Sequence, residues 1–200
     1  IVVPETMSGP ETSRMKGTLV KTGIDVSTRV DLKPRDRKNL LLELRSVRKR
    51  FEIVAVECRS PQVATVACRD RRVDLVSFPI NGRRTNIHLR LTDSCRASLE
   101  LDVSQLISSE ELPRHMILSR LRDQVATARS NHVSIVLSSG AEKPFMLRAP
   151  REVAAIGTLL GLTNVEALDS VSGIPFKIVN GNKTKLAPEH ITVGVKVKAK

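Results

Sequence analysis

Short apolar runs alternate along the chain with stretches in which apolar residues recur every three or four positions. The apolar runs are nearly continuous rather than half polar, which is typical of strands buried on both faces of a sheet. Strands are predicted at residues 1–3, 18–32, 52–57, 73–78, 97–101 and 132–137. Residues 4–17 are rich in Pro, Gly, Ser and Thr and predict a loop.

Helical patterns lie between most of these runs. In residues 35–50, Leu40, Leu44 and Val47 fall on one face of a predicted helix. Pro113 opens a long amphipathic pattern, and Pro150 suits the first turn of another helix. The predicted helices are 35–50, 61–70, 87–95, 113–129, 150–161 and two short pieces within 164–180. Residues 191–200 fit either a strand or a disordered tail.

This alternation predicts an α/β fold with a parallel sheet covered by helices. A TIM-like βα barrel and an open doubly wound sheet both fit. Neither G-x-G-x-x-G nor a P-loop follows any predicted strand. This absence argues against an open sheet that binds a nucleotide. We expect residues 1–182 to form the barrel domain and residues 183–200 a basic C-terminal tail.

Charge and composition change this picture by suggesting a partner. The formal net charge of the 200 residues is +12, and both halves of the chain contribute to the excess. Such an excess favours polyanionic partners. There is no Trp or Tyr and only four Phe, so the chain has few side chains on which bases could stack. We therefore expect RNA binding through phosphates, 2′-hydroxyls and shape.

The compartment follows from what the sequence lacks. No apolar run approaches the roughly 20 residues of a membrane span, and no leader pattern opens the chain, so we expect a soluble intracellular protein. The three cysteines have no C-x-x-C spacing, which argues against a zinc site or a disulfide framework. Cys58 and Cys68 are interpreted as small buried hydrophobic residues in a reducing compartment.

Catalytic residues of a βα barrel lie at the carboxyl ends of its strands. Those ends offer Asp31, Glu57 with Cys58, Ser77, Asp102, and Ser138 with Ser139. The four histidines are dispersed, and the paired serines lack the glycine pattern of a nucleophile elbow. We therefore expect a non-catalytic chain that itself binds no metal or cofactor.

Cations in the same loops are the candidates for RNA contact. Five of them are predicted to gather on one face of the barrel: Arg59, Arg83, Arg84, Lys143 and Arg148. Arginine grips phosphates in a bidentate manner, and such binding weakens with salt. Arg69, Arg71 and Arg72 precede a strand and are expected at the opposite end.

Three motifs carry a resemblance to a known family. They are the strand end Val136-Leu137-Ser138-Ser139-Gly140-Ala141, the following Leu147-Arg148-Ala149-Pro150, and the upstream Val73-Asp74-Leu75-Val76-Ser77-Phe78-Pro79. Over about residues 1–182 the chain resembles the ribonuclease P protein component 3 family. Asp74, Ser138, Ser139, Gly140 and Pro150 are the motif residues that this resemblance singles out.

The resemblance implies a βα-barrel, RNA-binding subunit of the ribonuclease P endoribonuclease, a ribonucleoprotein that removes 5′ leaders from precursor tRNA. It implies that the RNA carries the catalytic centre and uses Mg²⁺. The implied partners are that RNA, precursor tRNA and other protein subunits, especially a small one. An archaeal protein of this kind would be cytoplasmic, and a eukaryotic one nuclear or nucleolar. Residues 1–3 would match the family's second strand, leaving the first strand–helix unit without a counterpart.

Other readings of the same residues stay open. Gly140 could serve only a turn with positive φ, Asp74 could be a buried hydrogen-bonding residue, and Arg148 could pair with a carboxylate. For the whole chain the alternatives are a βα-barrel metal-dependent hydrolase or phosphoesterase, and a general binder of structured RNA. A hydrolase of that kind needs clustered His and Asp ligands. The RNA that co-purifies with the protein separates the general binder from a ribonuclease P subunit.

Overall fold

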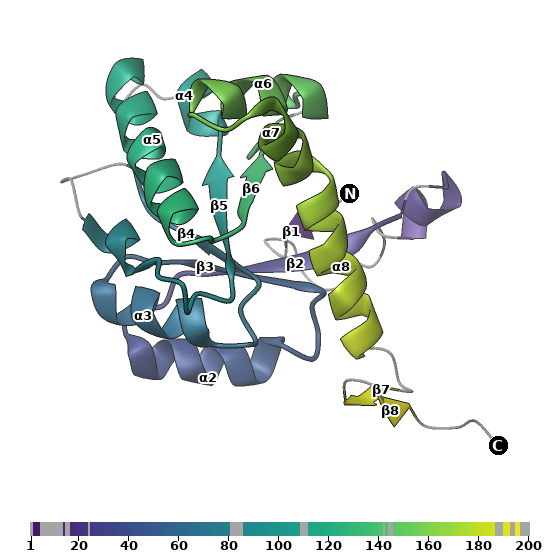
Figure 1. Ribbon diagram of the computed structural model, residues 1–200. Helices are drawn as coiled ribbons and strands as arrows, with labels where there is room; N and C mark the ends of the chain where they lie inside the picture. The colour runs from purple at the N-terminus through teal and green to yellow at the C-terminus, as the bar shows by residue number, and fades with distance from the viewer. Residues whose placement is uncertain are drawn as a thin grey trace.

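A parallel sheet of six strands organises the fold (Figure 1). The computed structural model describes residues 2–4, 14, 17–23, 25–80, 86–108, 112–141, 143, 146–186, 190–192 and 195–196. The strands are β1 (Val2–Pro4), β2 (Ser27–Leu32), β3 (Ile53–Glu57), β4 (Leu75–Ser77), β5 (Ser98–Asp102) and β6 (Ile135–Ser138). Each pairs in parallel with the next in sequence, which confirms the expected TIM-like βα-barrel architecture. Within the described residues no ladder joins β6 to β1.

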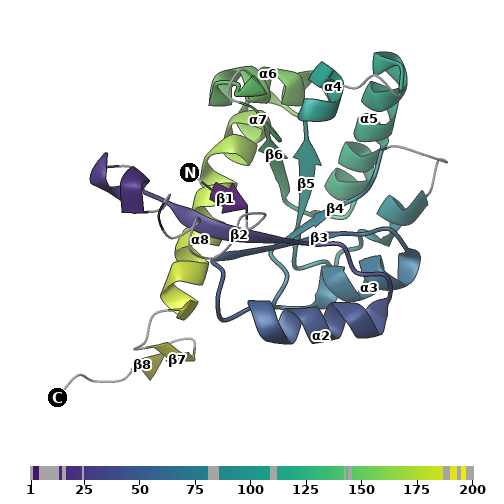
Figure 2. The same cartoon turned by 180° about the vertical axis from the view of Figure 1, so that it is seen from behind.

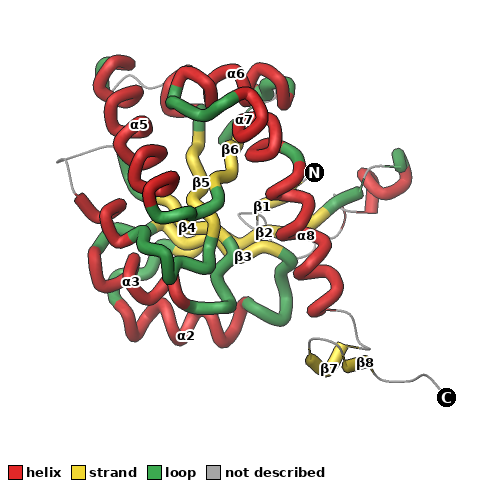
Figure 3. The backbone as a smooth tube through the Cα atoms, in the orientation of Figure 1, coloured by secondary structure: helices red, strands yellow, loops and turns green. Residues whose placement is uncertain are grey.

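Helices connect the strands and follow the last of them (Figure 3). They are α2 (Arg37–Val47), α3 (Pro61–Arg69), the 3-10 helix η1 (Asn86–Arg90), α4 (Ser104–Ser108), α5 (Arg114–Ser130), α6 (Pro150–Leu159), α7 (Asn164–Val171) and α8 (Gly173–Leu186). A short antiparallel pair, β7 (His190–Thr192) and β8 (Val195–Lys196), comes after α8.

Local chemistry fixes where several helices begin. The Asp36 side chain accepts a hydrogen bond from the Asn39 amide at the start of α2 (2.9 Å). Ser60 caps α3 in the same way, directly before Pro61. Such caps satisfy amide groups that have no partner inside the helix.

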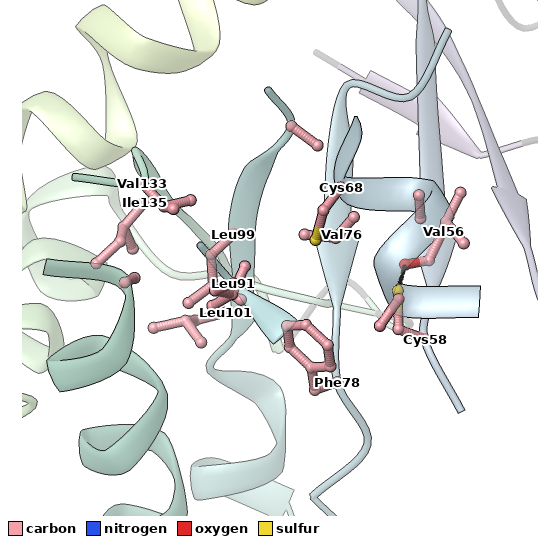
Figure 4. Packing of buried hydrophobic residues seen from close by; sticks show 14 of the residues in the cluster. Val56, Cys58, Cys68, Val76, Phe78, Leu91, Leu99, Leu101, Val133 and Ile135 are labelled. Carbon is pink, nitrogen blue, oxygen red and sulfur yellow. Dashed lines mark hydrogen bonds between the residues drawn. The ribbon is translucent and has the colours of Figure 1, made fainter. Parts of the chain in front are cut away.

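Alternate residues of the strands pack on the two faces of the sheet. One set, which includes Val56, Val76, Leu99 and Leu101, packs beneath the surrounding helices in the main core. Figure 4 shows these side chains with Cys58 and Cys68, which are both buried as predicted. Leu40 and Leu44 of α2, Val63 of α3, and Ile117 and Leu121 of α5 belong to the same core and are fully or almost fully buried.

The other face of the sheet is covered by α8. Ile53, Ala55, Leu75 and Val136 point to this side and pack against Ile174, Ile178 and Val179 of the helix. The helix follows all six strands in the chain and contacts both β3 and β6 (Figures 1 and 2). The concave side of the sheet is therefore filled by a C-terminal helix as well as by its own strand side chains.

Some expected elements were wrong. Only the second half of residues 18–32 is a strand, because residues 17–21 are helical and Gly23 turns the chain with φ +77°. The short helix α4 was missed, and the helix expected at 87–95 is a five-residue 3-10 turn. Most of the expected 4–17 loop lies outside the described residues, although residues 14 and 17 are helical.

The proposed division after residue 182 falls inside α8, which continues to Leu186. Lys183 pairs there with Asp25 at 2.6 Å. Whether the end of the chain is a separate tail stays a prediction. No helix in the described part of the chain is long and apolar enough to span a membrane.

Candidate nucleic-acid interface

Charged side chains lie on the concave side of the sheet. They share this side with the apolar set beneath α8, since Arg29 pairs in register with Ile53 and Glu100 with Val136. Because strand residues alternate between faces, each of these polar residues is two positions from another inward-facing residue on its strand. The inward charged residues are Arg29, Asp31, Glu57, Glu100 and Asp102.

An ion pair between Arg29 and Glu100 crosses this side of the sheet. The guanidinium donates to both carboxylate oxygens, at 2.5 and 2.6 Å, and also to Asp31 at 2.6 Å. Glu100 is 5% exposed. Burial by itself lowers the pKa of Arg29, but Glu100 and then Asp31 outweigh it and raise that pKa above its ordinary value. Since β3 and β4 separate β2 from β5, the pair spans the concave side across both of these strands.

A second group of charges lies at the end of β3. Glu57 accepts a hydrogen bond from Arg59 at 2.7 Å and pairs with Lys33 at 3.3 Å. Burial raises the pKa of Glu57, yet the two cations more than compensate and lower it. Arg59, which the sequence predicts to contact RNA, is exposed and lies at the expected end of the barrel. Its charge is largely balanced by its ion pair with Glu57.

The serine–glycine motif after β6 packs against Asp102. The Ser138 carbonyl accepts the Val103 amide at 3.0 Å, so the end of β6 is joined to the residue after β5. Gly140 has φ +53°, which confirms the positive-φ reading, and a Cβ at this position would overlap the Asp102 carboxylate. Ser139 lies between Ser138 and Gly140 in the chain. Burial raises the pKa of Asp102, although the Ser104 amide donates to it at 2.8 Å and opposes the rise.

Asp74 lies at the other end of the barrel and is a buried hydrogen-bonding residue. One carboxylate oxygen accepts from Arg48 at 2.7 Å and from the Val54 amide at 2.9 Å. The other oxygen accepts from the Asn182 amide group at 2.8 Å. Asn182 is 2% exposed. Asp74 thus joins α8 to β3 and to the end of α2, and it is not available to RNA.

The remaining predicted residues have mixed outcomes. Arg83 and Arg84 lie outside the described residues. Lys143 is exposed, whereas Arg148 is half-buried and donates to the Leu147 carbonyl at 2.9 Å. Lys143 and Arg148 each have a further interaction within the chain. Pro150 is the first residue of α6, where the Glu152 side chain accepts the Ala149 amide at 2.9 Å.

Reasoning from the sequence missed Arg29, Glu100 and Asn182. The signal for the first two was present, since each is a charged residue at an inward position of a strand pattern. Nothing local marks Asn182, because its partner is 108 positions away.

The part of the chain that the structure describes contains no group of three or more His, Cys, Asp or Glu residues placed to hold a metal ion. The three cysteines are free thiols. The charged side chains at the strand ends are held in ion pairs and hydrogen bonds within the protein.

Fold and site together define a basic TIM-like α/β barrel with ion pairs on the concave side of its sheet and at the carboxyl ends of its strands. The family model described as RNase P subunit p30 matches residues 5–187, and the chain belongs to this family.

Comparison with individual relatives agrees with this family. Ribonuclease P protein component 3 of Methanosarcina barkeri is 31% identical over 153 residues, which are 75% of this chain and 63% of the relative. The chain thus spans less than two thirds of the length of that relative. The protein of the same name from Methanococcoides burtonii is 28% identical over 178 residues, covering 88% of this chain and 73% of the relative.

A chain in a cryo-EM structure of archaeal ribonuclease P with mature tRNA has the same fold. Its TM-score is 0.85 at 20% sequence identity, over 100% of this chain and 88% of that chain. The similarity extends through α8, so the helix on the concave side of the sheet belongs to the shared fold.

Proposed function

We propose that this chain is a non-catalytic, RNA-binding protein subunit of ribonuclease P. The observation that carries the proposal is the family match over residues 5–187, which includes every strand from β2 to β6. The net charge of +12 supports an RNA partner. The proposed partners are the ribonuclease P RNA, precursor tRNA and other protein subunits, including a small one. In an archaeal cell the chain would work in the cytoplasm.

In this proposal the RNA removes the 5′ leader and uses Mg²⁺, and the protein organises the RNA. Arg83, Arg84, Lys143 and Arg148, with Arg59, are proposed to meet phosphates at the strand-end loops. The internal pairing of Arg59 with Glu57 makes Arg59 the weakest of these contacts. The ion pair of Arg29 and Glu100 connects β2 with β5 beneath these loops.

Reconstitution tests the proposed function. The ribonuclease P RNA, its other protein subunits and Mg²⁺ are assembled with and without this chain, and leader removal from precursor tRNA is measured. We expect the chain to raise the rate of leader removal, and the chain alone to leave precursor tRNA intact. Cleavage by the repurified, RNA-free chain would favour the hydrolase alternative. Co-purification of unrelated RNAs in place of ribonuclease P RNA would favour a general RNA-binding protein.

A further inference from the structure

The outer surface of α2 and α3 carries a set of exposed cations that the strand-end loops do not include. We define the α2–α3 cationic face by five side chains: Lys38, Arg45, Lys49, Arg69 and Arg71. All five are exposed, and none forms an ion pair with another residue that the structure describes.

Helix geometry places the first three in one row. Lys38, Arg45 and Lys49 are spaced by seven and four residues, which puts them on one side of α2 and of the turn that follows it. At 1.5 Å per residue the row extends about 16 Å. Leu40 and Leu44 of the same helix face the core, so the row points away from the sheet. Leu42, 55% exposed, is the apolar residue within it.

Arg71 adjoins the end of this row, and Arg69 is the last residue of α3, two positions before it. Arg48 donates to the Arg72 carbonyl at 3.5 Å, which brings the end of α2 beside the turn after α3. Lys49 follows Arg48 in the chain and Arg71 precedes Arg72, so these two cations flank the contact. Figure 1 shows α2 and α3 side by side over the same part of the sheet.

Carboxylates do not balance this face. Every acidic side chain between residues 37 and 80 is at least partly withdrawn from solvent. Glu52 accepts the Thr28 amide at 2.7 Å, Asp70 pairs with Arg72 at 2.7 Å, and Asp74 is held by Arg48 and Asn182. Glu52, Asp70 and Asp74 are thus used inside the protein, whereas the five cations form no ion pair within the part of the chain that the structure describes. The opposite arrangement holds at the strand ends, where Lys33 and Arg59 share Glu57.

Helix stability does not account for the whole face. A cation in the last turn of a helix is favoured by about 0.3–1 kcal/mol through the helix dipole, which could explain Arg45 and Arg69. Lys38 is the second residue of α2, where the dipole disfavours a cation, and the acid beside it, the N-cap Asp36, caps the helix by accepting the Asn39 amide. The cores of protein–protein interfaces are depleted in charged residues, so a protein partner fits this face of five cations less well.

We propose that the α2–α3 cationic face binds the sugar–phosphate backbone of double-helical RNA. This inference rests on the proposed function and names a second RNA-contacting surface, on helices that flank the sheet. An exposed row of Lys and Arg with no aromatic side chain binds the phosphates of a duplex according to its shape and charge, independently of its sequence.

The test uses the complete ribonuclease P reconstituted with its own RNA. In one variant Lys38→Gln, Arg45→Gln and Lys49→Gln are combined, because glutamine keeps a good helix propensity. The matched control combines Arg114→Gln, Arg151→Gln and Lys177→Gln, which removes three exposed, unpaired cations from α5, α6 and α8. A second variant, Arg69→Gln with Arg71→Gln, tests the α3 end independently. The dissociation constant for the RNA is measured between about 50 and 200 mM salt, the range in which phosphate contacts lose affinity steeply.

Each lost contact to a duplex phosphate lowers the slope of log affinity against log salt by about 0.9. Between the two ends of that fourfold salt range, a variant that lacks three contacts should lose about 40-fold less affinity than the wild type. We expect this change in the α2 variant, a smaller change in the same direction in the α3 variant, and a clearly weaker effect in the control. Circular dichroism melting curves should coincide for all four proteins.

Several results overturn the inference and leave the proposed function intact. One is an unchanged salt slope in the α2 variant while the wild-type complex binds RNA and supports leader removal. An equal loss in the control is another, because it shows only a general charge effect. A third is loss of a protein subunit from the complex with the RNA salt slope preserved, which makes the face a protein interface. Failure of the wild-type chain to join the RNA or to stimulate cleavage instead refutes the proposed function.

Discussion

Replacing Asp74 by alanine tests whether this motif residue stabilises the fold or contacts RNA. In the structure its carboxylate joins Arg48, the Val54 amide and Asn182 at one end of the barrel. Asp74→Ala removes all three acceptor contacts and leaves their donors in place. The variant should therefore be destabilised, and the RNA affinity of its folded fraction should be unchanged.

The magnitude follows from the burial of the groups left behind. Breaking a buried ion pair by removing one partner costs about 3–5 kcal/mol. The Asn182 amide and the Val54 amide lose their acceptor, at about 1–3 kcal/mol for each buried donor. Partial solvent access of Arg48, 15% exposed in its side chain, reduces the cost of its lost partner. Because the three contacts share one carboxylate, their energies do not add fully, and we expect a total of about 5 kcal/mol.

Urea denaturation and thermal melting measure this loss. For a chain of this size about 5 kcal/mol corresponds to a fall in Tm of about 10–20 °C. Asp93→Ala, at an exposed acid in the loop after η1, is the matched control and should change stability by less than about 0.5 kcal/mol. A double-mutant cycle with Asn182→Ala should give a coupling energy above about 1 kcal/mol. A loss below about 1 kcal/mol for Asp74→Ala, together with weaker RNA binding, would falsify the structural role.

Two further predictions concern the carboxyl end of the sheet. Gly140→Ala should cost more than about 2 kcal/mol, since the new Cβ meets both a positive φ and the Asp102 carboxylate. Gly161→Ala, at φ +102° with open space around it, should cost less, and equal losses in chemical denaturation would contradict the contact with Asp102. Asp102→Asn tests the effect of burial on the carboxyl group. Because burial raises the folded pKa of Asp102, its stabilising contribution is present below about pH 4 and is lost as pH rises through the raised value. Between about pH 4 and 7, the unfolding free energy of Asp102→Asn should therefore rise relative to that of the wild type. Parallel pH profiles of the two proteins would exclude this burial effect.

Sequence reasoning predicted the architecture well because hydrophobic patterning is a local signal. The strands β3, β4, β5 and β6 were each placed within three residues at both ends. The error at residues 18–32 arose because a short Thr-Leu-Val-Lys-Thr stretch fits a strand alternation and a helical turn equally well. Tertiary context decides between the two, and Gly23 separates the helical turn from β2.

The site was less accessible to sequence reasoning, since charge in a sequence does not show which charges are already paired. Arg59 is two residues past a strand end and looked free, but Glu57, the last residue of that strand, pairs with it. Arg69 and Arg71 were expected at the far end of the barrel, and only the structure shows that they form no ion pair with another described residue. Pairing depends on contacts between distant segments, and spacing along one chain does not encode them.

The position of α8 has a consequence for how the chain acquires its fold during synthesis. The ribosome completes all six strands of the sheet before it adds this helix, whose Asn182 reaches back to Asp74. Until then Ile53, Ala55, Leu75 and Val136 have no covering side chains from the helix. Contacts over such sequence separations form slowly, because the entropy of closing the loop is lost before the contact stabilises it. The nascent sheet therefore exposes an apolar surface to chaperones or to aggregation until the last helix emerges, and premature termination before Gly173 would leave that surface uncovered.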